Sequence, residues 1–274
     1  MPTRRLNPLL LGVIGRAQEQ HPNVRLYLFV VMSNHMHLIL SAPDCRVLSS
    51  FMNFINGNLA KEAGRLYEWQ EKFWGRRFTS IEILDQEKLM GRVHYLLSHG
   101  CKEGMVNRPG DWPGVNCVEA LTTGRSLKGV WLDRTAIYLS PDGDRDSRKY
   151  ETKYEVRLSP LPGFEEMSAG ARRSQWRRLI GGIEEEYEKG PPKDPKKIAR
   201  HPHDRPEKMK KGPRPFCHAT TRALRKLYRE AYALFVMAYR QARELLFEGD
   251  PKALEEFPPG SFIPPFATSF FDPG

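Results

Sequence analysis

The sequence predicts an α+β fold. The first observation is a strand-like stretch, residues 26–40, which is apolar and β-branched over most of its length and lacks Gly and Pro. The second is that segments with apolar residues at helical spacing lie on both sides of it. The third is a composition that becomes more basic and more Pro-rich toward the C-terminus. We therefore expect an α+β domain over residues 1–120 and a basic, mainly helical extension with a Pro-rich linker and tail over 121–274.

Caps and periodicity predict the elements of the first domain. Asn7 suits the start of a first helix, which residues 21–23 would end. After the apolar stretch, a second helix is expected over roughly 47–66, because its apolar residues recur on one side. A short strand at 79–84 and a third helix at about 86–99 complete the domain.

The second half of the chain is predicted to be mostly helical. Residues 154–158 alternate and indicate one strand, followed by a helix at about 168–189. Residues 190–211 are basic and Pro-rich, which is typical of a linker. A long amphipathic helix is expected at about 219–247, before an irregular tail from 257 to 274.

Net charge, cysteine spacing and apolar runs narrow the classes of partner and compartment that this sequence suggests. The 274 residues include 43 Lys and Arg against 33 Asp and Glu, a net charge of +10, which suggests a polyanionic partner. The four cysteines have no Cys-x-x-Cys spacing, so neither a disulfide framework nor a zinc knuckle is implied. We find no persuasive signal peptide and no apolar run long enough to span a membrane. A cytoplasmic protein without a membrane partner is therefore expected.

Two histidines mark the apolar stretch. In a strand, residues two apart face the same side, so His35 and His37 are expected side by side while Met36 and Leu38 face a core. Two imidazoles on one face form half of a metal site that needs a third ligand. The alternative is that both are satisfied polar residues on an exposed strand face, although the flanks are unusually apolar for such a face.

The residues around this pair carry a family resemblance. Met32-Ser33-Asn34-His35-Met36-His37-Leu38-Ile39-Leu40 resembles the signature of the single-tyrosine HUH transposases, and looks closest to the transposase-like proteins associated with repetitive extragenic palindromes. The resemblance implies a ferredoxin-like antiparallel sheet with helices on one face. It also implies that two histidines hold a divalent metal and that a tyrosine on a later helix is the nucleophile.

The third predicted helix contains a matching tyrosine. Tyr95-x-x-x-His99-Gly100 looks like the family's second motif, commonly Tyr-x-x-x-Asn-Pro, with His99 in the position of the third metal ligand. Residues i and i+4 share a helical face, and Gly100 is expected to end the helix. The alternative for Tyr95 is a buried helical tyrosine without a catalytic role.

The resemblance implies a transposase-like nuclease and strand transferase acting on single-stranded or hairpin DNA. Tyr95 would attack a phosphodiester, giving a 5′-phosphotyrosyl intermediate and a free 3′-OH. Mg²⁺ or Mn²⁺ is the family expectation, whereas three imidazoles would suit Zn²⁺ at least as well. Two alternatives stay open: a domesticated or truncated DNA-binding protein without cleavage activity, and a metal-dependent hydrolase in which Tyr95 is dispensable.

Two further features of the family concern the first strand of the sheet and the oligomeric state. Family members usually start with a strand before the first helix, whereas this sequence starts close to that helix; either the true start lies further upstream or the sheet has lost its first strand. Members are often dimers, and a homodimer is one expectation here.

Candidate DNA contacts cluster in three places. Aromatic rings can stack on bases while Arg and Lys neutralise phosphates. The alternatives are that the rings fill the core and that the basic runs are solvated. The predicted contacts lie in an aromatic and basic cluster, after the third helix, and in the linker: Lys72, Trp74, Arg76, Arg77, Lys102, Arg108, Lys208, Lys210 and Lys211.

Overall fold

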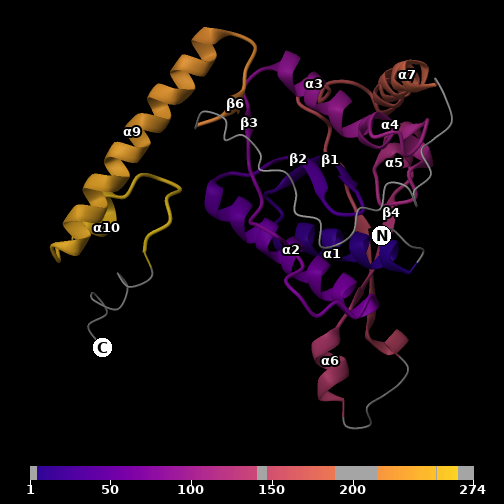
Figure 1. Ribbon diagram of the computed structural model, residues 1–274, viewed down its shortest axis with the longest axis horizontal. Helices are drawn as coiled ribbons and strands as arrows, with labels where there is room; N and C mark the ends of the chain where they lie inside the picture. Colours follow the sequence, from indigo (N-terminus) through magenta and orange to yellow (C-terminus); the bar gives the residue numbers. More distant parts are fainter. Residues whose placement is uncertain (1–4, 141–146, 189–214, 251, 265–274) are drawn as a thin grey trace.

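The computed structural model describes residues 5–140, 147–188, 215–250 and 252–264 (Figure 1). Within these ranges helices and short strands are mixed, and a helical part follows at the C-terminal end, which confirms the predicted α+β class. The described strands are shared among three two-stranded sheets rather than gathered into the single sheet that the resemblance implied. Two of these sheets are antiparallel, and the third joins two very short parallel strands.

The central apolar stretch is a hairpin. Strand β1 (Arg25–Val31) pairs antiparallel with β2 (Met36–Ser41), and the Met32 N–H donates to the His35 carbonyl at 2.8 Å to close the turn. The expectation of one strand through this stretch was therefore wrong. The physical reason is the polar pair Ser33-Asn34, whose side chains favour a turn over a sheet ladder.

The two edges of this hairpin differ. The outer edge of β1 is closed by a later segment, because the Val31 N–H donates to the Val115 carbonyl at 2.8 Å and the Trp112 indole N–H donates to the Val31 carbonyl at 2.9 Å. Strand β2, by contrast, has β1 as its only strand partner in the part of the chain that the structure describes. Its other edge faces the candidate site.

Helix α1 (Leu6–Gln20) packs closely on the sheet formed by β4 (Leu127–Leu132) and β5 (Glu151–Val156). Gly12 and Gly129 make this possible, because a Cβ on either residue would overlap the backbone of the other element. The helix starts earlier than expected, because Asn7 lies inside the helix rather than at its N-cap. The side-chain amide of Asn7 donates to the Pro113 carbonyl at 2.8 Å.

Helix α2 (Cys45–Leu66) confirms the second predicted helix with a start two residues earlier. The Asp44 carboxylate caps it by accepting from the backbone N–H groups of Arg46 and Val47, both at 2.8 Å. Phe51 and Ile55 on its apolar side are fully buried. The helix therefore covers the hairpin and α1 with one face and leaves the other to solvent.

Helix α3 (Gln86–Leu97) follows β3 (Glu82–Ile83), which pairs with β6 (Cys217–His218). Asp85 caps α3 and also accepts from the Thr220 backbone N–H at 2.6 Å and the Thr220 hydroxyl at 2.7 Å. One carboxylate thus ties the start of the C-terminal part to the third helix.

The main core extends beyond residue 120. Helix α7 (Ala169–Tyr187), capped by Ser168, contributes Trp176, Ile180 and Ile183 to the same cluster as β1 and α2. The domain boundary at 120 stays a prediction. The remaining described elements are α4 (His99–Lys102), η1 (Pro109–Asp111), α5 (Val118–Thr123), α6 (Arg134–Leu139), η2 (Ser147–Tyr150), α9 (Arg222–Phe247) and α10 (Ala253–Glu256).

Helix α9 stands apart from the main core at the left of Figure 1. Its end packs on α10 through Ala242 and Leu246, whereas Leu227 and Leu234 on its earlier turns are 61% and 67% exposed. Among the described helices, none combines the length and the apolar character needed to cross a bilayer. The predicted linker 190–211 lies outside the described residues.

Candidate metal and nucleophile site

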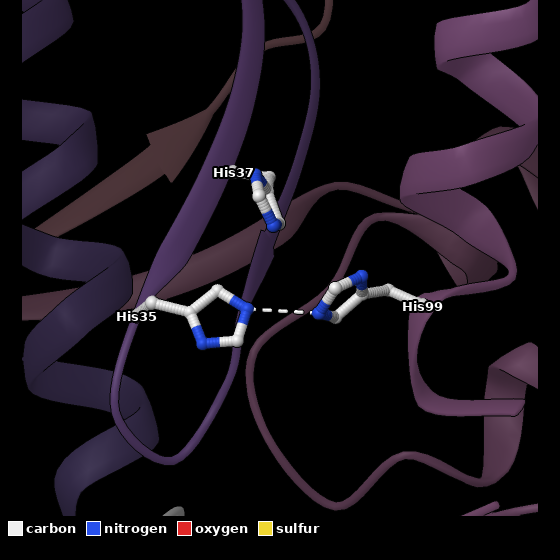
Figure 2. Close-up of side chains that lie close together, drawn as sticks. All are labelled: His35, His37 and His99. Atoms are coloured by element: carbon white, nitrogen blue, oxygen red, sulfur yellow. Dashed lines mark hydrogen bonds between the residues drawn. The ribbon is translucent and has the colours of Figure 1, made fainter. Parts of the chain in front are cut away.

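Three histidines converge beside the hairpin (Figure 2). His35 lies in the turn before β2, His37 lies on β2, and His99 begins α4. One ring nitrogen from each lies within 4.8 Å of the others, and the Nε2 atoms of His35 and His99 are 2.8 Å apart. The structure thus brings together the three residues that the sequence analysis selected as metal ligands.

The hairpin turn orients His35. The Asn34 side-chain oxygen lies 2.6 Å from His35 Nδ1 and can accept its proton, which leaves Nε2 to face the other imidazoles. Neighbouring carboxylates or carbonyls hold many metal-binding histidines in this way. Sequence analysis did not single out Asn34, although it stands directly before His35 in the motif.

The chain does not leave the helical path at Gly100, so the prediction of that glycine as the helix cap was wrong. Helix α3 ends at Leu97, Ser98 forms a turn, and α4 continues to Lys102. Gly104, with φ of 69°, takes the left-handed conformation instead, while Gly100 is buried against Trp112. This extra turn places His99 in the interior, where it is only 4% exposed.

Tyr95 lies next to the histidines. Its ring centroid is 5.6 Å from that of His37 and 5.2 Å from that of His99. Two cations approach the same ring, with Arg92 Cζ at 5.1 Å and Lys102 Nζ at 4.9 Å from its centroid. Arg92 was missed by the sequence analysis, although its position three residues before Tyr95 placed it on the same helical face.

Burial keeps the imidazoles neutral near pH 7. Burial lowers the pKa of His37 to about 4, with smaller contributions from His35 and His99. Burial also lowers the pKa of His35 and of His99. In addition, His99 Nδ1 is a buried nitrogen without a hydrogen-bond partner among the described residues. Neutral imidazole is the form that binds metals, so the donor set fits a divalent cation.

A groove of about 2930 Å³ opens from the histidines and runs along the free edge of β2. Its other walls come from α2 and from residues 72–85, and Tyr95 lines it together with the three imidazoles. Four predicted DNA contacts lie on its walls: Lys72, Trp74, Arg76 and Arg77. The groove therefore joins the candidate chemical site to a basic and aromatic surface.

Comparison with known proteins finds one family model that matches part of the chain. Residues 9–96 match the family model described as "Transposase IS200 like". This segment is similar to the IS200-like transposases and is called the IS200-like segment below. The matched residues of the IS200-like segment include His35, His37 and Tyr95, while His99 follows three residues after its end. No curated protein and no solved structure matches the chain.

Trp74 lies on a wall of the groove in the IS200-like segment and also packs against the core. Its indole N–H donates to the Asn56 carbonyl at 2.8 Å, and its half-buried ring packs against the core. The neighbouring residues Lys72, Arg76 and Arg77 are exposed on the same wall. The ring thus anchors the basic segment to α2.

The remaining predicted DNA contacts are spread over other regions. Lys102 is exposed beside Tyr95, and Arg108 is exposed before η1 without lining the groove. Lys208, Lys210 and Lys211 lie outside the described residues. The predicted DNA contacts that fall within the IS200-like segment are therefore the four on the groove wall.

Proposed function

We propose that the chain is a metal-dependent, transposase-like enzyme that cleaves and rejoins single-stranded DNA through Tyr95. The observation that carries the proposal is the position of the Tyr95 ring beside His37 and His99, two of the three converging imidazoles. The four side chains are contributed by the hairpin turn, β2, α3 and α4. A tyrosine is a suitable nucleophile because the covalent link conserves the energy of the phosphodiester bond.

The proposed reaction is one phosphoryl transfer. The Tyr95 hydroxyl oxygen forms a bond to phosphorus and loses its proton, while the bond from phosphorus to the 3′ oxygen breaks and that oxygen takes up a proton. The products are a 5′-phosphotyrosine and a free 3′-OH, and attack by a 3′-OH reverses the step. A divalent ion held by His35, His37 and His99 would polarise the phosphate and offset charge on the oxygens.

The neighbouring side chains fit these roles. Arg92 Cζ and Lys102 Nζ lie 5.1 and 4.9 Å from the centroid of the Tyr95 ring. They would place positive charge near the phosphate that Tyr95 attacks. Asn34 holds the His35 ring so that Nε2 faces the other two imidazoles. The groove provides a path for an extended strand, and Arg76, Arg77 and Trp74 on its wall would contact the phosphates and bases of that strand.

A labelled oligonucleotide tests the proposal. Hairpin-bearing single-stranded DNA, labelled at either the 5′ or the 3′ end, is incubated with the protein and Mg²⁺ or Mn²⁺ and separated under denaturing conditions. We expect a protease-sensitive adduct that carries only the 3′-side label. Cleavage without an adduct would favour a metal-dependent hydrolase, and binding with neither product would favour a DNA-binding protein without cleavage activity.

A further inference from the structure

Glu103 lies one helical turn beyond His99. The Glu103 N–H donates to the His99 carbonyl at 3.1 Å, and the Lys102 N–H donates to the Ser98 carbonyl at 2.7 Å, so the backbone keeps helical bonding up to Glu103. Residues four apart on a helix project from the same face. Tyr95, His99 and Glu103 therefore follow one another at four-residue intervals along one side of α3 and α4.

The Glu103 side chain faces the same groove as the histidines. It is one of the residues that line the groove with His35, His37 and His99. Glu103 and the three imidazoles therefore border one continuous groove.

We propose that Glu103 is the fourth protein ligand of this cation site, supplying a carboxylate oxygen beside the three imidazoles. The inference rests on the proposed function, because it concerns the same site. The Glu103 carboxylate oxygens are not part of the group of ring nitrogens that lie within 4.8 Å of one another. Glu103 is exposed, however, and an exposed glutamate can change rotamer when a cation binds. Two side chains at i and i+4 on a helix are a known way to hold one metal ion.

The ligand chemistry gives this residue a specific consequence. Three neutral imidazoles leave the charge of a divalent ion uncompensated, and by donor type they suit Zn²⁺. A carboxylate oxygen is the donor preferred by Mg²⁺ and Mn²⁺. Glu103 would therefore shift the site toward the harder ions that phosphoryl transfer commonly uses.

Metal titration of the full chain tests this role without measuring activity. MnCl₂ is added to the wild type, Glu103→Gln, Glu87→Gln and His37→Ala, and free Mn²⁺ is followed by electron paramagnetic resonance. Glu87 is the matched control, because it is exposed on α3 and does not line the groove. Competition with a chromophoric chelator gives the Zn²⁺ affinity of the same proteins.

We expect Glu103→Gln to weaken Mn²⁺ binding by about 10-fold or more, and Zn²⁺ binding by a smaller factor, with Glu87→Gln unchanged. Wild-type Mn²⁺ affinity in Glu103→Gln, together with its loss in His37→Ala, would overturn the role of Glu103 and leave the histidine site in place. Wild-type Mn²⁺ affinity in His37→Ala would overturn both the metal site and this inference. Circular dichroism of each variant confirms that the fold is retained.

Discussion

The Nε2 atoms of His35 and His99 lie 2.8 Å apart although 64 residues separate them in the sequence. One histidine comes from the turn of a β-hairpin and the other from the helix that follows Tyr95. Their contact therefore places the hairpin turn beside α4, the short helix that follows the helix carrying the proposed nucleophile. Any change that moves either element separates the imidazoles from each other and from Tyr95.

Tyr95→Phe removes one hydroxyl and leaves the ring in place. We expect the variant to form no covalent DNA adduct, because phenylalanine cannot attack phosphorus, while its affinity for single-stranded DNA stays close to that of the wild type. Denaturing gels measure the adduct, and fluorescence anisotropy measures the affinity. Tyr138→Phe is the control, since Tyr138 is 86% exposed and does not line the groove. Adduct formation by Tyr95→Phe would show that another residue is the nucleophile.

The low pKa of His37 makes the metal-free protein sensitive to acid. Burial lowers this pKa to about 4, below the usual 6.5, so the unfolded chain binds the proton more tightly than the folded one. The resulting stability is present above pH 6.5 and is lost as the pH falls toward 4. Thermal unfolding of metal-free wild type and His37→Asn at several pH values measures this effect. We expect the wild type to lose Tm relative to the variant over this range, and a constant difference would contradict the prediction.

The close approach of α1 and β4 is tested by a pair of glycine substitutions. Gly12→Ala places a Cβ where the backbone of β4 lies, and overpacking of this kind costs about 1–3 kcal/mol. Gly57→Ala is the control on α2, where nothing lies within 4 Å, and it is expected to stabilise by about 0.5–1 kcal/mol. Urea unfolding measures both. Equal effects of the two substitutions would show that α1 and β4 are not in backbone contact.

Glu62 is a buried carboxylate, 6% exposed, and Arg134 holds it through two hydrogen bonds of 2.6 and 3.1 Å. Arg134→Ala removes both hydrogen bonds and leaves the more distant ion pair with Arg65, at 3.7 Å, and should cost about 2 kcal/mol. Arg125→Ala, which breaks an exposed pair with Glu119, should change stability by less than about 0.5 kcal/mol. Urea unfolding compares the two, and a similar small loss for both would show that the Glu62 pair is not buried.

The basic wall of the groove is tested by salt dependence. The double substitution Arg76→Ala and Arg77→Ala should weaken binding to single-stranded DNA at low salt and reduce the slope of log affinity against log salt by roughly 0.7 for each lost phosphate contact. Arg177→Ala with Arg178→Ala on α7 is the control, because these exposed arginines do not line the groove. An unchanged slope in the groove variant would place the DNA path elsewhere.

Local signals predicted much of the fold and the members of the site. The spacing His35-x-His37 and the position of His99 four residues after Tyr95 selected the four residues that the structure brings together. Apolar periodicity predicted the start of α2 to within two residues, because a long amphipathic pattern is a local signal for a helix.

Signals at the turns were less reliable because they depend on neighbours distant in the sequence. The sequence alone did not show that Gly104, rather than Gly100, takes the left-handed conformation; Gly100 is instead packed against Trp112. Arg92 and Glu103 also went unnoticed, since a charged residue on a helix is informative only when its neighbours in space are known.

The sequence by itself thus determined the chemistry: three imidazoles and one phenol at spacings that allow them to share a site. Only the tertiary structure decided that they do share one, by packing the hairpin turn against α4 until His35 and His99 came within 2.8 Å. It also decided which cations and carboxylates surround them. The physical reason is that helix and strand periodicity are encoded locally, whereas the approach of two elements depends on the packing of a core to which the whole chain contributes.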